Sequence, residues 1–221
     1  MLSGSFSIEC FNMNVDKLQN PGRIRQQNQE LIFAAAQNEF VDHGFKGASI
    51  KRIAERAGLP RANIHYYYKN KLALYEAVLG DIVQTWNSSF DTIHAEDDPK
   101  EALTAYIRAK VMYSKTHPSA SRIFASEIIH GAPHLQEYLQ GEFYDWMQQK
   151  ITAIESWIAA GKMTPIDPLY LLFFIWGATQ HYADFGVQVL AAMNKENLTS
   201  SEFEDIADSL VNLVLRGCGI S

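Results

Sequence analysis

The chain has 221 residues, of which 47% are hydrophobic and 20% charged, and this composition excludes a chain that is disordered as a whole. Its net charge of −6 at pH 7 excludes a protein coated with basic charge. The charge is nevertheless uneven, because residues 17–71 hold ten lysines and arginines against four acidic residues, a net charge of +6. Such asymmetry is typical of a polyanion-binding segment joined to a segment with another role.

The N-terminal segment, the cysteines and the apolar runs predict in which cellular compartment the protein is found. Residues 1–22 lack the charge pattern and apolar core of a signal peptide, so we expect a flexible N-terminal arm. Cys10 and Cys218 lie near opposite ends with no disulfide or metal spacing, which favours the reducing cytoplasm. The longest apolar run has eight residues, 169–176, far below the roughly 18 to 20 that cross a membrane, so we expect no membrane partner.

Apolar residues at helical spacing recur along the chain and predict an all-α fold of about nine helices. The first covers about residues 25–43 and ends at Gly44, a residue suited to the left-handed position after a helix. Ser49 is the expected N-cap of a short helix that Gly58 and Pro60 end. The remaining helices are expected at residues 61–69, 71–90 with Asn70 as its cap, 101–117, 120–130, 134–160, 169–193 and about 203–214.

Two short helices joined by a turn that contains glycine predict a helix-turn-helix, whose second helix enters the major groove of DNA. Basic side chains at helix starts can donate to phosphates beside the backbone N–H groups, and they are Lys51, Arg52, Arg61 and Lys71. Asn63 and His65 can contact base edges, while Tyr66 and Tyr67 can contact phosphate and sugar. Taken alone, two short helices favour a solvated basic face on a small helical bundle over a DNA-binding unit.

A longer pattern decides between these readings. The strings GFKGASI at 44–50, IAERAG at 53–58 and NIHYYYKNK at 63–71 together resemble the DNA-binding domain of TetR-family repressors. The resemblance implies an all-α homodimer, with a small N-terminal domain on a palindromic DNA operator and a larger C-terminal domain that binds a small effector and dimerises. We therefore expect an arm at 1–22, a helix-turn-helix domain at 23–72 and an effector-binding and dimerisation domain at 73–221.

Carried over by position, the family's DNA contacts fall on nine residues, which are Ser49, Lys51, Arg61, Ala62, Asn63, His65, Tyr66, Tyr67 and Lys71. The chain departs from the family where it has His65 in place of a frequent Tyr and Tyr68 in place of a frequent Phe. Base preference therefore does not transfer, and the hydroxyl group of Tyr68 needs a hydrogen-bond partner if it is buried.

The run WGATQHYADF at 176–185 is similar to one branch of the family, the RutR type, which represses pyrimidine-utilisation genes and is relieved by uracil or thymine. This resemblance implies that Trp86, Trp176 and Gln180 hold the pyrimidine. Trp176 and Gln180 are four residues apart and so share a helix face, with Phe173 one turn earlier and Phe124 as a further wall candidate. A carboxamide can complement one edge of uracil while indole rings stack on its faces.

Other functions remain open at this stage. The aromatic residues can be plain core, and the effector can instead be an acyl-CoA or a hydrophobic drug. Glu127 and His130 have the Glu-x-x-His spacing of di-iron bundles, but the sequence holds one copy where a site needs two. No catalytic motif is present, so we expect no enzyme, no cofactor and no metal. The expected dimer surface combines the helix that begins near Pro168 with the last helix.

Overall fold

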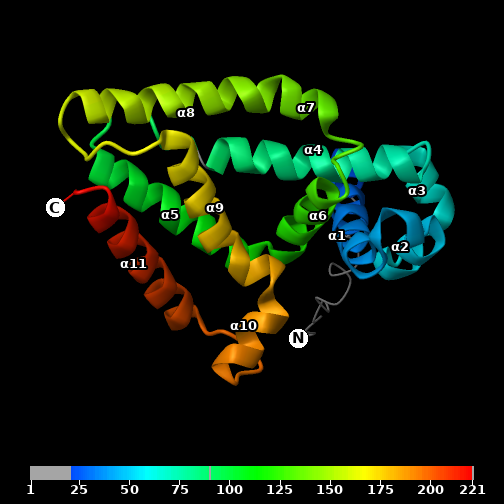
Figure 1. Cartoon of the computed structure of the whole chain (residues 1–221). Helices are drawn as coiled ribbons and strands as arrows, with labels where there is room; N and C mark the ends of the chain where they lie inside the picture. Colours follow the sequence, from blue (N-terminus) through cyan, green and yellow to red (C-terminus); the bar gives the residue numbers. More distant parts are fainter. Residues whose placement is uncertain (1–20, 90, 221) are drawn as a thin grey trace, which may run out of the picture.

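The computed structural model describes residues 21–89 and 91–220, and these residues form eleven helices and no strand (Figure 1). The predicted all-α fold is therefore confirmed for the described part of the chain. The predicted arm at 1–22 lies outside the described residues, except for its last two, which begin the first helix.

Three helices pack into a small N-terminal unit, and they are α1 (Pro21–Gly47), α2 (Ile50–Ala57) and α3 (Arg61–Tyr67). Apolar side chains from all three form its centre, namely Ile32, Ala36, Phe40, Ile53, Ala54 and Ile64. The regular part of α1 is interrupted at Gly44, which has a φ of 63° and a ψ of 174°. The glycine thus takes the left-handed φ predicted for it, although a further helical turn follows.

Local hydrogen bonds fix the turn between α2 and α3. The Ser49 hydroxyl accepts from the Arg52 backbone N–H at 3.2 Å, as an N-cap does. Gly58 ends α2 in the left-handed conformation, with a φ of 66° and a ψ of 25°. Both predicted boundaries are confirmed, and together they fix the direction in which α3 leaves α2.

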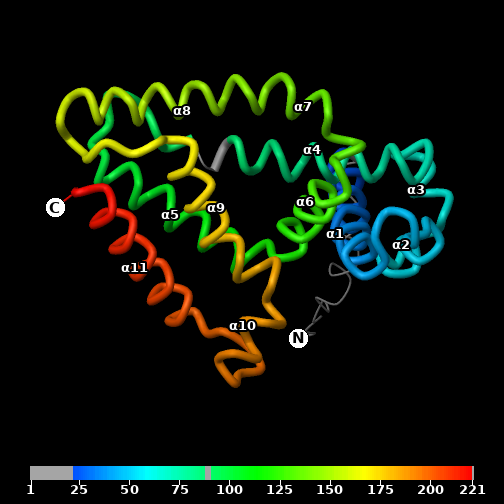
Figure 2. Tube along the Cα trace, viewed as in Figure 1, coloured from blue at the N-terminus to red at the C-terminus, as the bar shows by residue number. Residues whose placement is uncertain are grey.

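The helix α4 (Lys71–Ser89) leads from this unit into the rest of the molecule (Figure 2). Asn70 caps its start, because its side-chain oxygen accepts from the Ala73 backbone N–H at 2.8 Å. Its predicted apolar stripe is buried through Leu74, Val78 and Ile82. One helix therefore connects the two parts of the chain to which the sequence assigns different roles.

Seven helices build the larger unit, and they are α5 (Pro99–Thr116), α6 (Pro118–Ile129), α7 (Gln136–Gln140), α8 (Glu142–Ala159), α9 (Pro168–Asp184), α10 (Gly186–Met193) and α11 (Ser200–Gly217). The central helix α5 packs against both α9 and α11, while α6 packs against α1 and α9. Figure 1 shows α7 and α8 running along one side of this unit, opposite α10.

Two predicted helices are each divided in the structure. The helix expected at 134–160 breaks at Gly141, whose φ of −110° and ψ of −102° are far from helical values, so α7 and α8 are separate. The helix expected at 169–193 breaks at Phe185, which has a ψ of 29° and precedes Gly186. Both breaks involve a glycine, the residue that lowers the cost of leaving the helix. They account for the difference between nine expected helices and eleven found in the described ranges.

Within the described ranges, no helix combines the length and the apolar composition that crossing a membrane requires. The same ranges contain no cluster of three or more histidine, cysteine or acidic side chains placed to hold a metal ion.

Candidate functional site

The predicted recognition helix α3 presents one face to solvent and one to the core. Ile64 is fully buried and holds the helix against the small unit. Arg61, Ala62 and His65 are exposed, and Tyr66 is 74% exposed. Asn63 and Tyr67 are half-buried at the edges of this face. The exposed face of the helix therefore carries hydrogen-bonding and aromatic side chains.

The Tyr68 hydroxyl group has the partner that the sequence analysis required. Tyr68 is half-buried, its ring lies 6.0 Å from that of Phe33, and its side chain is hydrogen-bonded to Gln29. Burial is the main cause that raises the pKa of this phenol. Tyr68 thus anchors the end of α3 onto α1.

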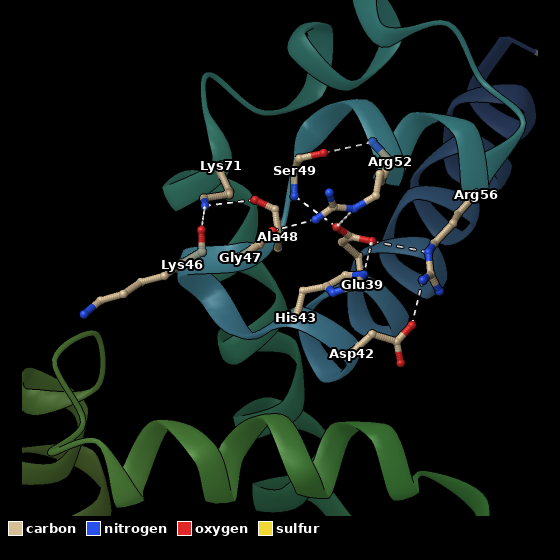
Figure 3. A network of polar contacts seen from close by, with 10 residues as sticks. All are labelled: Glu39, Asp42, His43, Lys46, Gly47, Ala48, Ser49, Arg52, Arg56 and Lys71. Atoms are coloured by element: carbon tan, nitrogen blue, oxygen red, sulfur yellow. Dashed lines mark hydrogen bonds and ion pairs between the residues drawn. The ribbon is translucent and has the colours of Figure 1, made fainter.

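A buried carboxylate, Glu39 on α1, organises the basic side chains of α2 (Figure 3). It accepts from the Ser49 backbone N–H at 3.1 Å and from Arg52 Nε at 2.6 Å, and Arg56 Nε lies 3.3 Å from it. Arg56 also donates to Asp42 at 2.6 Å. Because Glu39 is fully buried, these contacts join α1 to α2 in a setting where charge-assisted hydrogen bonds are strong.

Arg52 takes part in this network, since its guanidinium group contacts Glu39 and donates to the Gly47 carbonyl at 2.5 Å. Its side chain is also 43% exposed, so the phosphate contact suggested for it stays a prediction. Lys51, its neighbour, is exposed and lies 3.8 Å from Glu55 on the surface of the same helix.

The ammonium group of Lys71 already has partners within the protein. It donates to the carbonyls of Lys46 and Ala48 at 3.1 and 3.0 Å (Figure 3). The same group lies 4.8 Å from the centre of the Phe45 ring. The two hydrogen bonds satisfy carbonyls that the end of α1 leaves open. An ammonium group has three N–H donors, and two are directed at these carbonyls.

A cavity of about 380 Å³ lies inside the larger unit. Four of the five predicted effector-binding residues line it: Trp86 from α4, Phe124 from α6, and Trp176 and Gln180 from α9. Trp86 packs against Phe124, with ring centres 4.4 Å apart. The structure thus brings together three elements that are distant in the sequence.

Phe173, the fifth predicted residue, does not line the cavity. Its side chain is 50% exposed, and its ring lies 5.6 Å from that of Trp176. Phe173 precedes Trp176 by three residues, which is about 4.5 Å along a helix axis. Spacing along one helix therefore predicts that the two rings are neighbours, but not that both face the cavity.

The sequence analysis missed most of the polar lining, including Lys110 and Tyr106 from α5. Tyr106 accepts a hydrogen bond from Trp176 Nε1 at 2.6 Å and so orients that indole. Lys110 is 5% exposed, and its ammonium group lies 5.3 Å from the Trp86 ring centre and 5.8 Å from that of Trp176. Burial lowers the pKa of Lys110 to about 7, against the opposing effect of Asp184.

One signal in the sequence could have identified Lys110. It falls within the apolar stripe of its helix, on the same side as Leu103, Tyr106 and Ile107. A lysine in such a stripe is rarely buried without a role. The other lining residues that were not predicted are Asn87, Tyr138, Leu139, Phe143 and Trp146, and Ile128 completes the wall.

A second polar cluster joins the two units. Glu127 on α6 is 4% exposed and accepts from the Tyr75 hydroxyl at 2.9 Å and from the His134 backbone N–H at 2.7 Å. The His134 ring lies 5.0 Å from that of Phe45, which belongs to α1. The Glu-x-x-His spacing in the sequence therefore does not describe a pair here, because Glu127 contacts His134 while His130 contacts the Ser126 carbonyl.

Comparison with known families divides the chain in two. Residues 32–78 match the family described as "Bacterial regulatory proteins, tetR family". Residues 79–221 match the family described as "YcdC-like protein, C-terminal region".

Among curated proteins, the chain is 36% identical to the HTH-type transcriptional regulator RutR of Escherichia coli strain K12 over 195 residues, which is 88% of this chain and 92% of that protein. It is 29% identical to the HTH-type transcriptional repressor SCO4008 of Streptomyces coelicolor, over 73% of this chain and 80% of that one. These relatives are transcriptional regulators and not enzymes.

Solved structures share the fold at low identity. A TetR-family regulatory protein from Rhodococcus RHA1 superposes with a TM-score of 0.70 at 17% identity, covering 88% of this chain and 98% of that one. The regulator AibR, solved with isovaleryl coenzyme A and operator DNA, has a TM-score of 0.62 at 18% identity, covering 85% and 97%. Regulators of this kind bind operator DNA and small effectors and act as dimers. This chain belongs to the TetR family of bacterial transcriptional regulators.

Proposed function

We propose that the protein is a homodimeric repressor whose operator binding is relieved by uracil or a closely related pyrimidine. One observation carries the choice of effector: Trp86, Trp176 and Gln180, which the sequence analysis grouped, line a single cavity although they come from two distant helices. The similarity to RutR over 88% of the chain supports the same branch of the family.

The lining suits a flat ring with polar edges. The indole rings of Trp86 and Trp176 supply aromatic surface, and the Gln180 carboxamide supplies one acceptor and two donors. A pyrimidine ring with an N–H between two carbonyls complements such an amide. An apolar ligand would leave the amide without a partner, at a cost of roughly 1 to 3 kcal/mol.

The rival effector is an acyl-CoA, because AibR was solved with isovaleryl coenzyme A. A site for a purely apolar acyl chain needs no polar group on its walls. Here Gln180, Asn87 and Lys110 all line the cavity, and this favours the pyrimidine.

For DNA, we propose that α3 enters the major groove. The exposed Arg61, Ala62, His65 and Tyr66, together with Asn63 and Tyr67 at the edges of the face, contact base edges and the backbone. Ser49, Lys51 and Lys71 contact phosphates, and the remaining donor of the Lys71 ammonium group supplies its contact. Two such helices in a dimer reach half-sites about 34 to 36 Å apart.

The dimer surface is proposed on the outer face of α9, α10 and α11. Large apolar side chains there are exposed in the single chain, namely Tyr170, Phe173, Phe174, Phe185, Val187 and Leu213. A run of exposed apolar residues of this kind marks a protein interface. Pairing α9 and α11 with their symmetry copies covers it, as in an isologous contact.

The experiment begins with an operator, obtained by selecting duplexes that bind the protein from a random library. Calorimetric titration with uracil then compares the wild type with Trp176→Ala and Gln180→Ala. Gln188→Ala is the matched control, since Gln188 is an exposed amide on α10. Operator affinity is measured by fluorescence anisotropy with and without uracil.

We expect one uracil per chain, lost in both cavity variants and kept in Gln188→Ala, and a 5- to 150-fold weaker operator affinity with uracil, which corresponds to about 1 to 3 kcal/mol of coupling. A dimer that binds the selected duplex but gives no heat with uracil contradicts the pyrimidine effector. Heat with isovaleryl coenzyme A in the same protein favours the rival. Equal operator affinity with and without bound uracil contradicts the relief mechanism.

A further inference from the structure

We infer that the effector cavity selects a ring that carries a negative charge, held by the ammonium group of Lys110. This inference rests on the proposed function and adds to it an order of preference among pyrimidines, in which anions bind more tightly than neutral rings.

The charge of the cavity wall is the first support. Lys110 is the one charged residue among the described residues that line the cavity, and no carboxylate is among them. The other polar lining residues are neutral, namely Asn87, Tyr106, Tyr138 and Gln180. A ligand in this space therefore meets a positive group in a surrounding of aromatic rings, where charge interactions are strong.

The position of the ammonium group is the second support. It lies 5.3 Å from the Trp86 ring centre, 5.8 Å from that of Trp176 and 5.9 Å from that of Tyr106. The two tryptophans are those proposed to receive the flat ring. A pyrimidine stacked beside them has its ring oxygens within reach of the ammonium group.

The titration of Lys110 is consistent with this role. Burial lowers its pKa to about 7, and the charged group that acts on it is Asp184 of α9, which opposes the shift. Asp184 is itself held by the Ser121 hydroxyl at 2.6 Å, with Arg122 and His181 as its other charged or titratable neighbours. An anion in the cavity raises the pKa of Lys110 again, so binding takes up a proton near neutral pH.

The test compares two pyrimidine rings of different charge, which differ by one carbonyl group. Uracil is neutral at pH 7, whereas barbiturate, the 2,4,6-trioxopyrimidine, is an anion. Calorimetric titrations use the wild-type dimer, Lys110→Met and the matched control Lys100→Met, which removes an exposed lysine from the same helix. We expect the wild type and the control to bind barbiturate at least about tenfold more tightly than uracil, since a hydrogen bond between charged groups is worth that ratio. In Lys110→Met this preference disappears.

A measurement on the wild type alone covers the case in which Lys110→Met does not fold. Titrations with barbiturate at pH 7.5, in buffers of different ionisation enthalpy, should show proton uptake, and affinity should fall as the pH rises from about 6.5 to 8.5. Tight uracil binding with no preference for barbiturate and no proton uptake overturns this inference and leaves the proposed function standing. Binding of neither ring overturns both.

Discussion

Glu127, at the contact between the two units, allows a quantitative prediction of stability. Its two carboxylate oxygens, 4% exposed, accept from the Tyr75 hydroxyl at 2.9 Å and from the His134 backbone N–H at 2.7 Å. Glu127→Gln keeps the shape but replaces one oxygen with an NH₂ group. The backbone N–H cannot rotate, so the amide oxygen must face His134 and the NH₂ group must face Tyr75. The NH₂ group can donate to the Tyr75 oxygen, but the hydroxyl proton then loses its acceptor, and the hydrogen bond to a charged group is lost.

The cost follows from the bond that is lost. A hydrogen bond to a charged group contributes about 1.5 to 3 kcal/mol, so we expect Glu127→Gln to lower the free energy of unfolding by about 2 kcal/mol. For a chain of this length, that is a fall in Tm of about 4 to 8 °C. Thermal unfolding followed by circular dichroism, at equal protomer concentration, measures it. Glu137→Gln, an exposed change on α7, is the matched control and should leave the Tm within about 1 °C.

A double-mutant cycle with Tyr75→Phe tests the cause. If the two side chains interact as described, the double variant loses less stability than the sum of the single variants, by about 1 kcal/mol or more. Strict additivity refutes the reasoning, as does an unchanged Tm for Glu127→Gln.

Three further changes separate structural from functional roles. Gly58→Ala should lower the free energy of unfolding by about 1 kcal/mol, because φ is 66° at that position. Gly80→Ala, in the exposed interior of α4, should raise it by about 0.5 to 1 kcal/mol. Urea unfolding of the two variants measures both changes. Lys110→Met should remove a pH dependence of the free energy of unfolding. The pKa of Lys110 is about 7 in the folded protein, below its value in the unfolded chain, so the unfolded state binds more protons above pH 7. Wild-type stability relative to the variant then rises by about 1.4 kcal/mol per pH unit, measured by urea unfolding from pH 7 to 9, and a flat difference contradicts the burial of this lysine. Arg61→Ala should reduce the slope of log affinity against log salt concentration for duplex binding by about 0.9 and leave the Tm unchanged. Arg52→Ala should lower the Tm, because its ion pair with Glu39 is lost. The opposite pattern contradicts both assignments.

How far the sequence predicts this structure depends on the range of the interactions. The caps at Ser49 and Gly58 were predictable, because each depends on bonds within a few residues of the chain. The break at Gly141 was missed, since the apolar pattern of the surrounding helices continues across it and a single glycine is compatible with a continuous helix.

In the candidate sites, too, short-range patterns were predictable and contacts between distant segments were not. Exposure of Arg61 and His65 follows from the periodicity of α3 alone. The ion pair of Arg52 depends on Glu39, thirteen residues away on another helix, and no periodicity within α2 indicates it. The cavity role of Lys110 depends on α4 and α9 as well as its own helix, so the apolar stripe indicates its burial but not the aromatic rings beside its ammonium group.

The proposed relief of repression requires little movement. Trp86, in the cavity wall, and Tyr75, in contact with Glu127, lie on one helix, eleven residues or about 16 Å apart. If Tyr75 acts as the pivot, a shift of about 1 Å at Trp86 tilts α4 by about 3 to 4°. The small unit at the start of α4 tilts with it, and symmetry in a dimer doubles the change in separation of the two recognition helices. Hydrogen bonds to base edges weaken steeply beyond about 3.2 Å. Losing one or two of them per operator supplies the 1 to 3 kcal/mol of coupling that relief requires, without any helix unfolding.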